Sequence, residues 1–120
     1  MHTQAKKVAC SGVLGEVAWP EGDGVRVDTW VVSGTNISPN YDSLIAKVMT
    51  HADTRERAVE RMLGVLRGMR VKGIPTNAQL CAAVLENEEF LGGRYDTHLL
   101  LRLPMQPCYA EARAPPCRML

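Results

Sequence analysis

The sequence has almost no excess of charge of either sign and no apolar N-terminal segment. Its 14 Lys and Arg residues nearly balance 13 Asp and Glu residues, which leaves a formal net charge of +1. Such a balance gives no electrostatic reason to expect nucleic acid or an anionic membrane as a partner. The four cysteines, Cys10, Cys81, Cys108 and Cys117, have no CxxC spacing. We therefore expect reduced thiols in the cytoplasm, or inside the mitochondrion if the sequence belongs to a larger chain.

Motifs that carry chemistry by themselves are also missing. Neither GxxxxGK[ST] nor GxGxxG occurs, and the pair Gly92-Gly93 precedes no predicted helix whose amides could bind an anion. The histidines, His2, His51 and His98, are scattered and have no paired cysteines at ligand spacing, so a zinc site is disfavoured. We expect no resident metal and no autonomous nucleotide binding.

A chain of 120 residues is long enough for one modest domain and too short for a second. Residues 1–10 are polar and basic without periodicity, and residues 104–120 contain four prolines, which oppose regular structure. We predict poor order at both ends, with a tail of 104–120 that contains Pro and Cys. The single domain is expected over residues 11–103.

Within this domain, strands are expected before helices. Apolar and β-branched residues predict strands over 13–19 and 25–32, joined as an antiparallel pair, and a central strand over 44–50. Apolar residues at helical spacing predict an amphipathic helix over 54–69 that begins at an Asp or Thr cap. An edge strand over 71–74, a helix over 77–86 and a turn at 88–91 follow. The predicted fold class is α+β, a small antiparallel sheet packed with two or three helices.

Four polar or aromatic residues stand out against this pattern. Asp42 lies at the entrance to a buried strand, where an acid is costly unless paired, so it either caps a turn or takes part in a site. Lys47 interrupts the same strand, and an ion pair or hydrogen bond is favoured over catalysis. Arg26 and Trp30 alternate with the apolar positions and share the other face of their strand. That face is either plain surface or an interface with a second chain.

Several segments, in order, resemble the C-terminal domain of biotin carboxylase. They are residues 24–30 (GVRVDTW), 38–47 (SPNYDSLIAK), 72–77 (KGIPTN) and 95–100 (YDTHLL), and the resemblance covers about residues 11 to 101. The amino acids at positions 28–30 and 38–41 are most similar to those of the urea carboxylase branch, which includes the urea amidolyases. Acetyl-CoA, propionyl-CoA, methylcrotonyl-CoA and pyruvate carboxylases share the same framework.

The resemblance implies an ATP-grasp ligase that uses ATP and Mg²⁺ to activate bicarbonate and moves the carboxyl group to biotin on a carrier protein. It places Arg26 at the carboxylase dimer interface and Asp42 close to the biotin and bicarbonate site. It places Thr97 and His98 beside the base of the nucleotide. The implied partners are the ATP-grasp half or a homologous carboxylase chain, a biotin carrier domain and a second copy in a homodimer.

The family's phosphate loop, metal-binding carboxylates and catalytic arginine have no counterpart before Gly12 in this sequence. These groups dominate phosphoryl transfer, so this chain is not expected to be a competent enzyme alone. An alternative of another class is a non-catalytic interaction module that uses Arg26 and Trp30 to bind a carboxylase or itself. An unrelated small α+β enzyme is disfavoured, because no catalytic constellation is visible.

Overall fold

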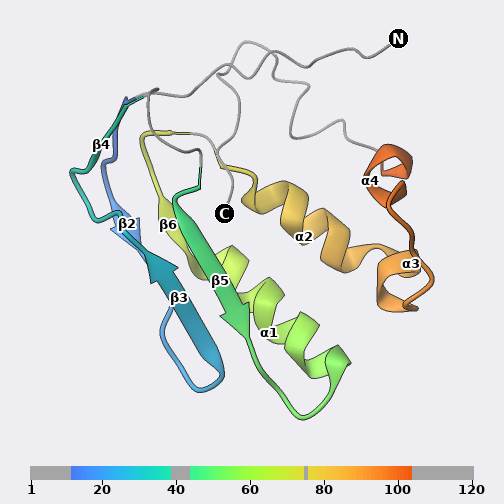
Figure 1. The fold of residues 1–120 in the computed structure, drawn as a ribbon. Coiled ribbons are helices and arrows are strands. Elements are labelled where there is room, and N and C mark those ends of the chain that lie inside the picture. The colour runs from blue at the N-terminus through green and yellow to red at the C-terminus, as the bar shows by residue number, and fades with distance from the viewer. Residues whose placement is uncertain (1–11, 39–43, 75, 104–120) are drawn as a thin grey trace, which may run out of the picture.

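The computed structural model describes residues 12–38, 44–74 and 76–103. Figure 1 shows the strands gathered at one side, helix α1 behind β5, and helices α2 to α4 extending away from the strands. Helix α1 (Arg55–Gly68) packs against both α2 (Ala78–Glu86) and β5 (Ala46–Thr50). The arrangement is the predicted α+β class, with helices packed against short antiparallel strands.

The strands form three antiparallel pairs in the described part of the chain. These pairs are β1 (Gly12–Val13) with β4 (Asn36–Ile37), β2 (Val17–Ala18) with β6 (Arg70–Val71), and β3 (Val25–Thr29) with β5. The predicted pairing of residues 13–19 with residues 25–32 is therefore wrong. The first segment changes partner midway, because the Leu14 amide donates to the Thr35 carbonyl while the Gly15 amide donates to the Lys72 carbonyl, each at 2.9 Å.

Strand β3 is also shorter than the predicted strand over 25–32. It ends at Thr29, whose hydroxyl donates to the Ile45 carbonyl at 2.7 Å and accepts the Val31 amide at 3.2 Å. Local side-chain bonds of this kind compete with the strand ladder. The predicted alternation of inward-facing and outward-facing side chains is confirmed at the start of β3, because Val25 and Val27 are half-buried whereas Arg26 is exposed.

The strand ends enclose the main hydrophobic core. Its buried members come from β1 to β6 and their connections, and they are Leu14, Val31, Ile37, Ile45, Ala46 and Ile74. Trp19 is partly buried and packs against this cluster. Burial of this apolar area is the main favourable term for a domain of this size.

The amphipathic helix predicted over 54–69 is confirmed as α1. The Thr54 hydroxyl caps it by accepting the Arg57 amide at 3.3 Å, and the helix ends at the cap residue Met69. The predicted apolar stripe, which consists of Ala58, Met62, Val65, Leu66 and Met69, is buried or half-buried along its whole length. The sequence periodicity therefore identified the packed face of this helix correctly.

The remaining elements are short. Helix α2 confirms the prediction over 77–86. Its apolar spacing predicts that Leu80, Ala83 and Val84 face inward, but Ala83 is exposed, whereas Leu85 is half-buried. The predicted turn at 88–91 is α3 (Glu88–Leu91), and α4 (Leu99–Arg102) was not predicted. The edge strand expected over 71–74 is shorter and begins one residue earlier, as β6 (Arg70–Val71). No helix in the described ranges is long and apolar enough to cross a membrane.

Candidate functional site

The exposed face of β3 carries a charged pair next to an exposed indole. The Arg26 guanidinium donates to both carboxylate oxygens of Asp28, at 2.9 and 3.0 Å. This hydrogen bonding lowers the pKa of Asp28, and Lys47, which lies opposite it in the β3–β5 register, adds a smaller contribution. Lys47 is exposed on this face, so it does not interrupt a buried strand.

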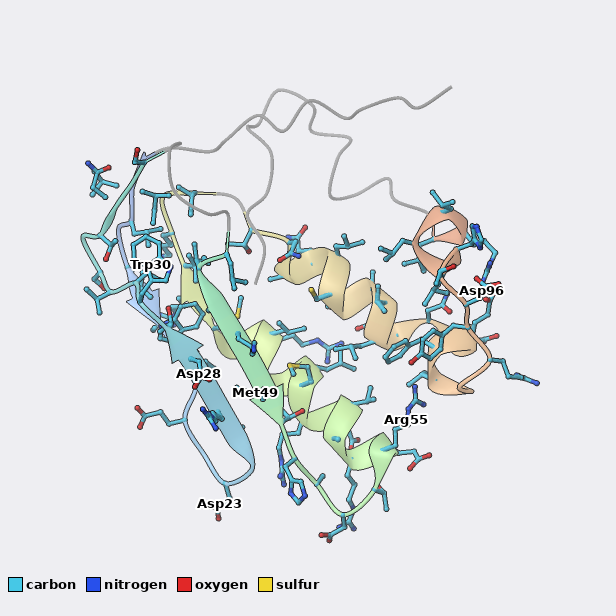
Figure 2. The ribbon with its side chains drawn as sticks, in the orientation of Figure 1. Asp23, Asp28, Trp30, Met49, Arg55 and Asp96 are labelled. Atoms are coloured by element: carbon cyan, nitrogen blue, oxygen red, sulfur yellow. The ribbon has the colours of Figure 1, made fainter. Side chains whose placement is uncertain are left out.

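Trp30 follows β3 directly and stays at the surface. Its indole N–H donates to the Leu44 carbonyl at 3.0 Å, and 51% of the residue is exposed. Val32 and Leu44 are also exposed apolar residues. Figure 2 shows Trp30 and Asp28 at the same end of the molecule. The two predicted interface residues, Arg26 and Trp30, are thus both accessible to a partner, as an interface requires.

The other predicted pair, Thr97 and His98, lies in an exposed loop that enters α4. Asp96 organises this loop, because its Oδ1 accepts the His98 amide at 2.9 Å and a guanidinium N–H of Arg102 at 3.0 Å. Arg102 also donates to Glu89 on α3, at 2.8 and 3.2 Å. The loop is therefore tied to two helices through charged groups.

A second connection joins this region to α1. The Arg55 guanidinium lies 5.0 Å from the centre of the Phe90 ring and donates to the carbonyls of Phe90 and Leu91, at 2.5 and 2.7 Å. Phe90 stacks on Tyr95 with the ring centres 4.8 Å apart. Cation–π attraction and carbonyl bonds together fix the start of the loop relative to α1. Periodicity gave no sign of this cluster.

The acid that organises this loop makes stability sensitive to pH. The amide of His98 and then the guanidinium of Arg102 lower the pKa of Asp96. A lowered folded pKa contributes stability above the unfolded value of about 3.9, and that contribution is lost as the pH falls through the folded pKa. We expect Asp96→Asn to be less stable than the parent at neutral pH and to approach it in acid. Urea unfolding of both proteins across this pH range measures the difference, and a constant difference would contradict the assignment.

The two predicted sites are not brought together. Figure 2 places Trp30 and Asp96 at opposite sides of the molecule. Asp42, the remaining candidate, lies outside the described residues. In the described ranges no three His, Cys, Asp or Glu residues gather in a way that could hold a metal ion. These residues therefore do not fit a Mg²⁺ site of their own.

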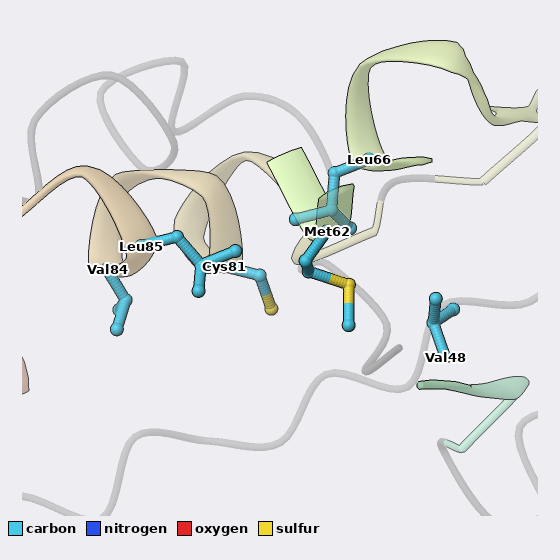
Figure 3. A pocket seen from close by; sticks show the side chains of 6 residues that line it. All are labelled: Val48, Met62, Leu66, Cys81, Val84 and Leu85. Carbon is cyan, nitrogen blue, oxygen red and sulfur yellow. The ribbon is translucent and has the colours of Figure 1, made fainter. Parts of the chain in front are cut away.

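An apolar groove opens between β5, α1 and α2. The sequence analysis did not predict this groove. It has a volume of about 270 Å³ and is lined by Val48, Met62, Leu66, Cys81, Val84 and Leu85. Figure 3 shows these side chains converging from the three elements. Burial raises the pKa of the Cys81 thiol, which favours its neutral form. The apolar spacing predicts that Met62 and Leu66 in α1 and Cys81 and Val84 in α2 face inward, but it could not show that they line an open groove rather than a closed core.

Comparison with known proteins relates this fold to one family. The family model of the biotin carboxylase C-terminal domain matches residues 2–102. The biotin carboxylase of Haemophilus influenzae is 42% identical over 89 residues, which are 74% of this chain and 20% of that protein. The urea amidolyase of Saccharomyces cerevisiae is 34% identical over 104 residues, which are 87% of this chain and 6% of that protein.

A solved structure supports the same relation. The biotin carboxylase domain dimer of Hydrogenobacter thermophilus 2-oxoglutarate carboxylase, in complex with MgADP, ADP and bicarbonate, superposes with a TM-score of 0.76 at 33% identity. The match covers 79% of this chain and 21% of that one. The chain thus spans about a fifth or less of the length of these relatives. The family match and the shared fold together show that this chain belongs to the biotin carboxylase C-terminal domain family.

Proposed function

We propose that this chain supplies the C-terminal domain of an ATP-dependent biotin carboxylase, which carboxylates biotin on a carrier domain with bicarbonate. The family match over residues 2–102 carries the proposal. It is supported by the solved relative, whose complex contains MgADP and bicarbonate. ATP, bound with Mg²⁺, supplies the activation of bicarbonate in this reaction, and we assign the groups that hold the phosphates and the metal to the rest of the carboxylase.

The contribution of this chain is positional. We propose that Thr97 and His98 border the adenine pocket, and the contacts of Asp96 with the His98 amide and Arg102 support this role by fixing the loop. A fixed loop orients a ligand without a further ordering cost at the moment of binding. Asp42 is proposed to lie near biotin and bicarbonate, on the basis of the family resemblance alone.

The face with Arg26 and Trp30 is proposed as a contact with a second carboxylase copy. Two observations support this assignment: the solved relative is a dimer, and both side chains are exposed. Arginine and tryptophan are enriched among residues that dominate interface energy. The same face would serve the alternative function, a non-catalytic module that binds a carboxylase or itself, for which the exposed Trp30 is the specific observation.

A chimera tests the proposed function. The segment of the Haemophilus influenzae biotin carboxylase that matches this chain would be exchanged for residues 12–103, and ATP cleavage would be measured with and without bicarbonate. We expect bicarbonate-dependent cleavage in the chimera. A folded chimera that binds ATP but shows no bicarbonate-dependent cleavage would contradict the proposed role as a carboxylase domain and favour the interaction module.

A further inference from the structure

Arg102, in the last turn of α4, joins α3 to the Thr97–His98 loop. Its Nη1 donates to Asp96 Oδ1 at 3.0 Å, and its Nε and Nη2 donate to Glu89 Oε2 at 3.2 and 2.8 Å. A planar guanidinium can bond two carboxylates at once, because its N–H donors are held in a fixed fork. Hydrogen bonds from these two carboxylates raise the pKa of Arg102, so the bridging group stays charged.

Asp96 carries this connection into the backbone of the loop. The Oδ1 atom that accepts the Arg102 N–H also accepts the His98 amide, at 2.9 Å. That amide belongs to the peptide that joins Thr97 to His98, so a displacement of the Asp96 carboxylate would shift the backbone from which both side chains project. Arg102 therefore acts on the loop through Asp96.

Glu89 is a suitable anchor, because α3 is itself fixed at both ends. At its start, the Asn87 side chain accepts the amides of Glu89 and Phe90, at 2.9 and 3.2 Å. At its end, the Arg55 guanidinium of α1 donates to the carbonyls of Phe90 and Leu91. The loop is therefore connected to a helix whose position is determined by α1.

The exposure of these groups indicates that their contacts determine geometry more than stability. The side chains of Arg102, Glu89 and Asp96 are 41%, 45% and 62% exposed. Ion pairs that are this open to solvent usually add little to the free energy of unfolding. A loop held in one conformation still binds its ligand more tightly, since the apparent Kd rises as the fraction of molecules in the binding conformation falls.

We propose that Arg102 is a positioning residue for the nucleotide base, which acts through Asp96 to hold Thr97 and His98 in the conformation that binds the base. This inference rests on the proposed function, in which the loop borders the adenine pocket. The base is remote from the phosphate that reacts, so its contacts contribute equally to the ground state and the transition state. Loss of Arg102 should therefore raise the KM for ATP and leave kcat unchanged.

Arg102→Met in the chimera tests this role, because methionine keeps an unbranched apolar side chain and removes the donors. We expect the KM for ATP and the Kd of MgATP to rise about three- to tenfold, with kcat for bicarbonate-dependent cleavage unchanged. The inhibition constant of magnesium tripolyphosphate, which has the phosphates but no base, should stay as in the parent chimera. An active parent whose Arg102→Met variant binds MgATP equally well would overturn this inference and leave the proposed function standing. An equal weakening of tripolyphosphate binding would also overturn it.

Arg67→Met is the matched control. Arg67 also joins two helices through an exposed ion pair, since its Nη2 on α1 lies 2.5 Å from Glu86 Oε1 on α2. Its partner is Glu86 and not a carboxylate of the loop, so Arg67→Met should leave the KM for ATP unchanged. An equal rise of this KM in both variants would assign the effect to general loosening of the helices and overturn the proposal.

A double-mutant cycle tests the path through Asp96. Asp96→Ala removes the carboxylate that joins Arg102 to the loop, so Arg102→Met should change the KM for ATP little further in that background. The same fold-change in KM with and without the Asp96 carboxylate would show that Arg102 does not act through Asp96, and would overturn the inference.

Discussion

Leu14→Ala is expected to lower the free energy of unfolding by about 3–5 kcal/mol, the range observed when a buried leucine leaves a cavity. Leu14 is 1% exposed and belongs to the buried cluster between the strands. The chain also changes partner here, from β4 to β6, so the surrounding strands are poorly placed to collapse into the space. The free energy of unfolding of a whole domain is only about 5–15 kcal/mol, so this substitution would remove a large part of it.

The matched control for this variant is Leu101→Ala, which makes the same substitution at a residue that is 81% exposed. Surface changes of this kind are usually within about 0.5 kcal/mol. Urea unfolding of the parent and both variants, with tryptophan fluorescence as the probe, gives the two differences. Similar losses at both positions would mean that Leu14 does not lie in the core.

Gly73→Ala should cost at least about 3 kcal/mol, because two separate penalties combine at this position. The first is backbone strain, since Gly73 has a φ of +107° that L-residues rarely adopt. The second is a clash, since an added Cβ would lie 2.5 Å from the Val13 carbonyl oxygen and 3.1 Å from the Gly15 nitrogen. Both neighbours are backbone atoms that cannot move aside cheaply, because Val13 pairs with Asn36 in β4 and the Gly15 amide donates to the Lys72 carbonyl.

Gly34→Ala separates the two penalties. Gly34 has a φ of +87°, but a Cβ at that position would meet nothing within 4 Å. We expect a loss of about 1 kcal/mol, from strain alone. Thermal and urea unfolding of the two alanine variants should therefore differ clearly. A loss at Gly73 no greater than at Gly34 would contradict the close approach of residues 13–15 to Gly73.

The sequence predicted helices better than strand pairing, for a physical reason. Helix α1 repeats its apolar positions at helical spacing, and Thr54 supplies a local cap, so both its face and its start can be read from nearby residues. The partner of residues 13–19 depends on contacts with Thr35 and Lys72, which lie far along the chain. Because these residues are apolar at both parities, no alternation indicated which neighbour they would pair with.

The family resemblance named the candidate site residues, but neither the resemblance nor the periodicity indicated the tertiary contacts around them. Thr97 and His98 were proposed as site residues from the resemblance, and the structure shows that both lie in an exposed loop. The anchor of that loop, in which Arg55 packs over Phe90, joins residues 35 positions apart and follows no periodic rule. The groove likewise became visible only when α1 and α2 were placed together.

The separation of the buried cluster from the Thr97–His98 loop has an evolutionary consequence. All buried members of that cluster lie at or before Ile74, whereas the loop depends on Asp96, Arg102 and the Arg55–Phe90 contact. Substitutions that repack the strands need not alter the loop, because distant sites without shared partners contribute independently. Descendants of this domain could therefore accumulate substitutions in the strand core while the Thr97–His98 loop keeps its conformation, and neither region would force compensating changes in the other.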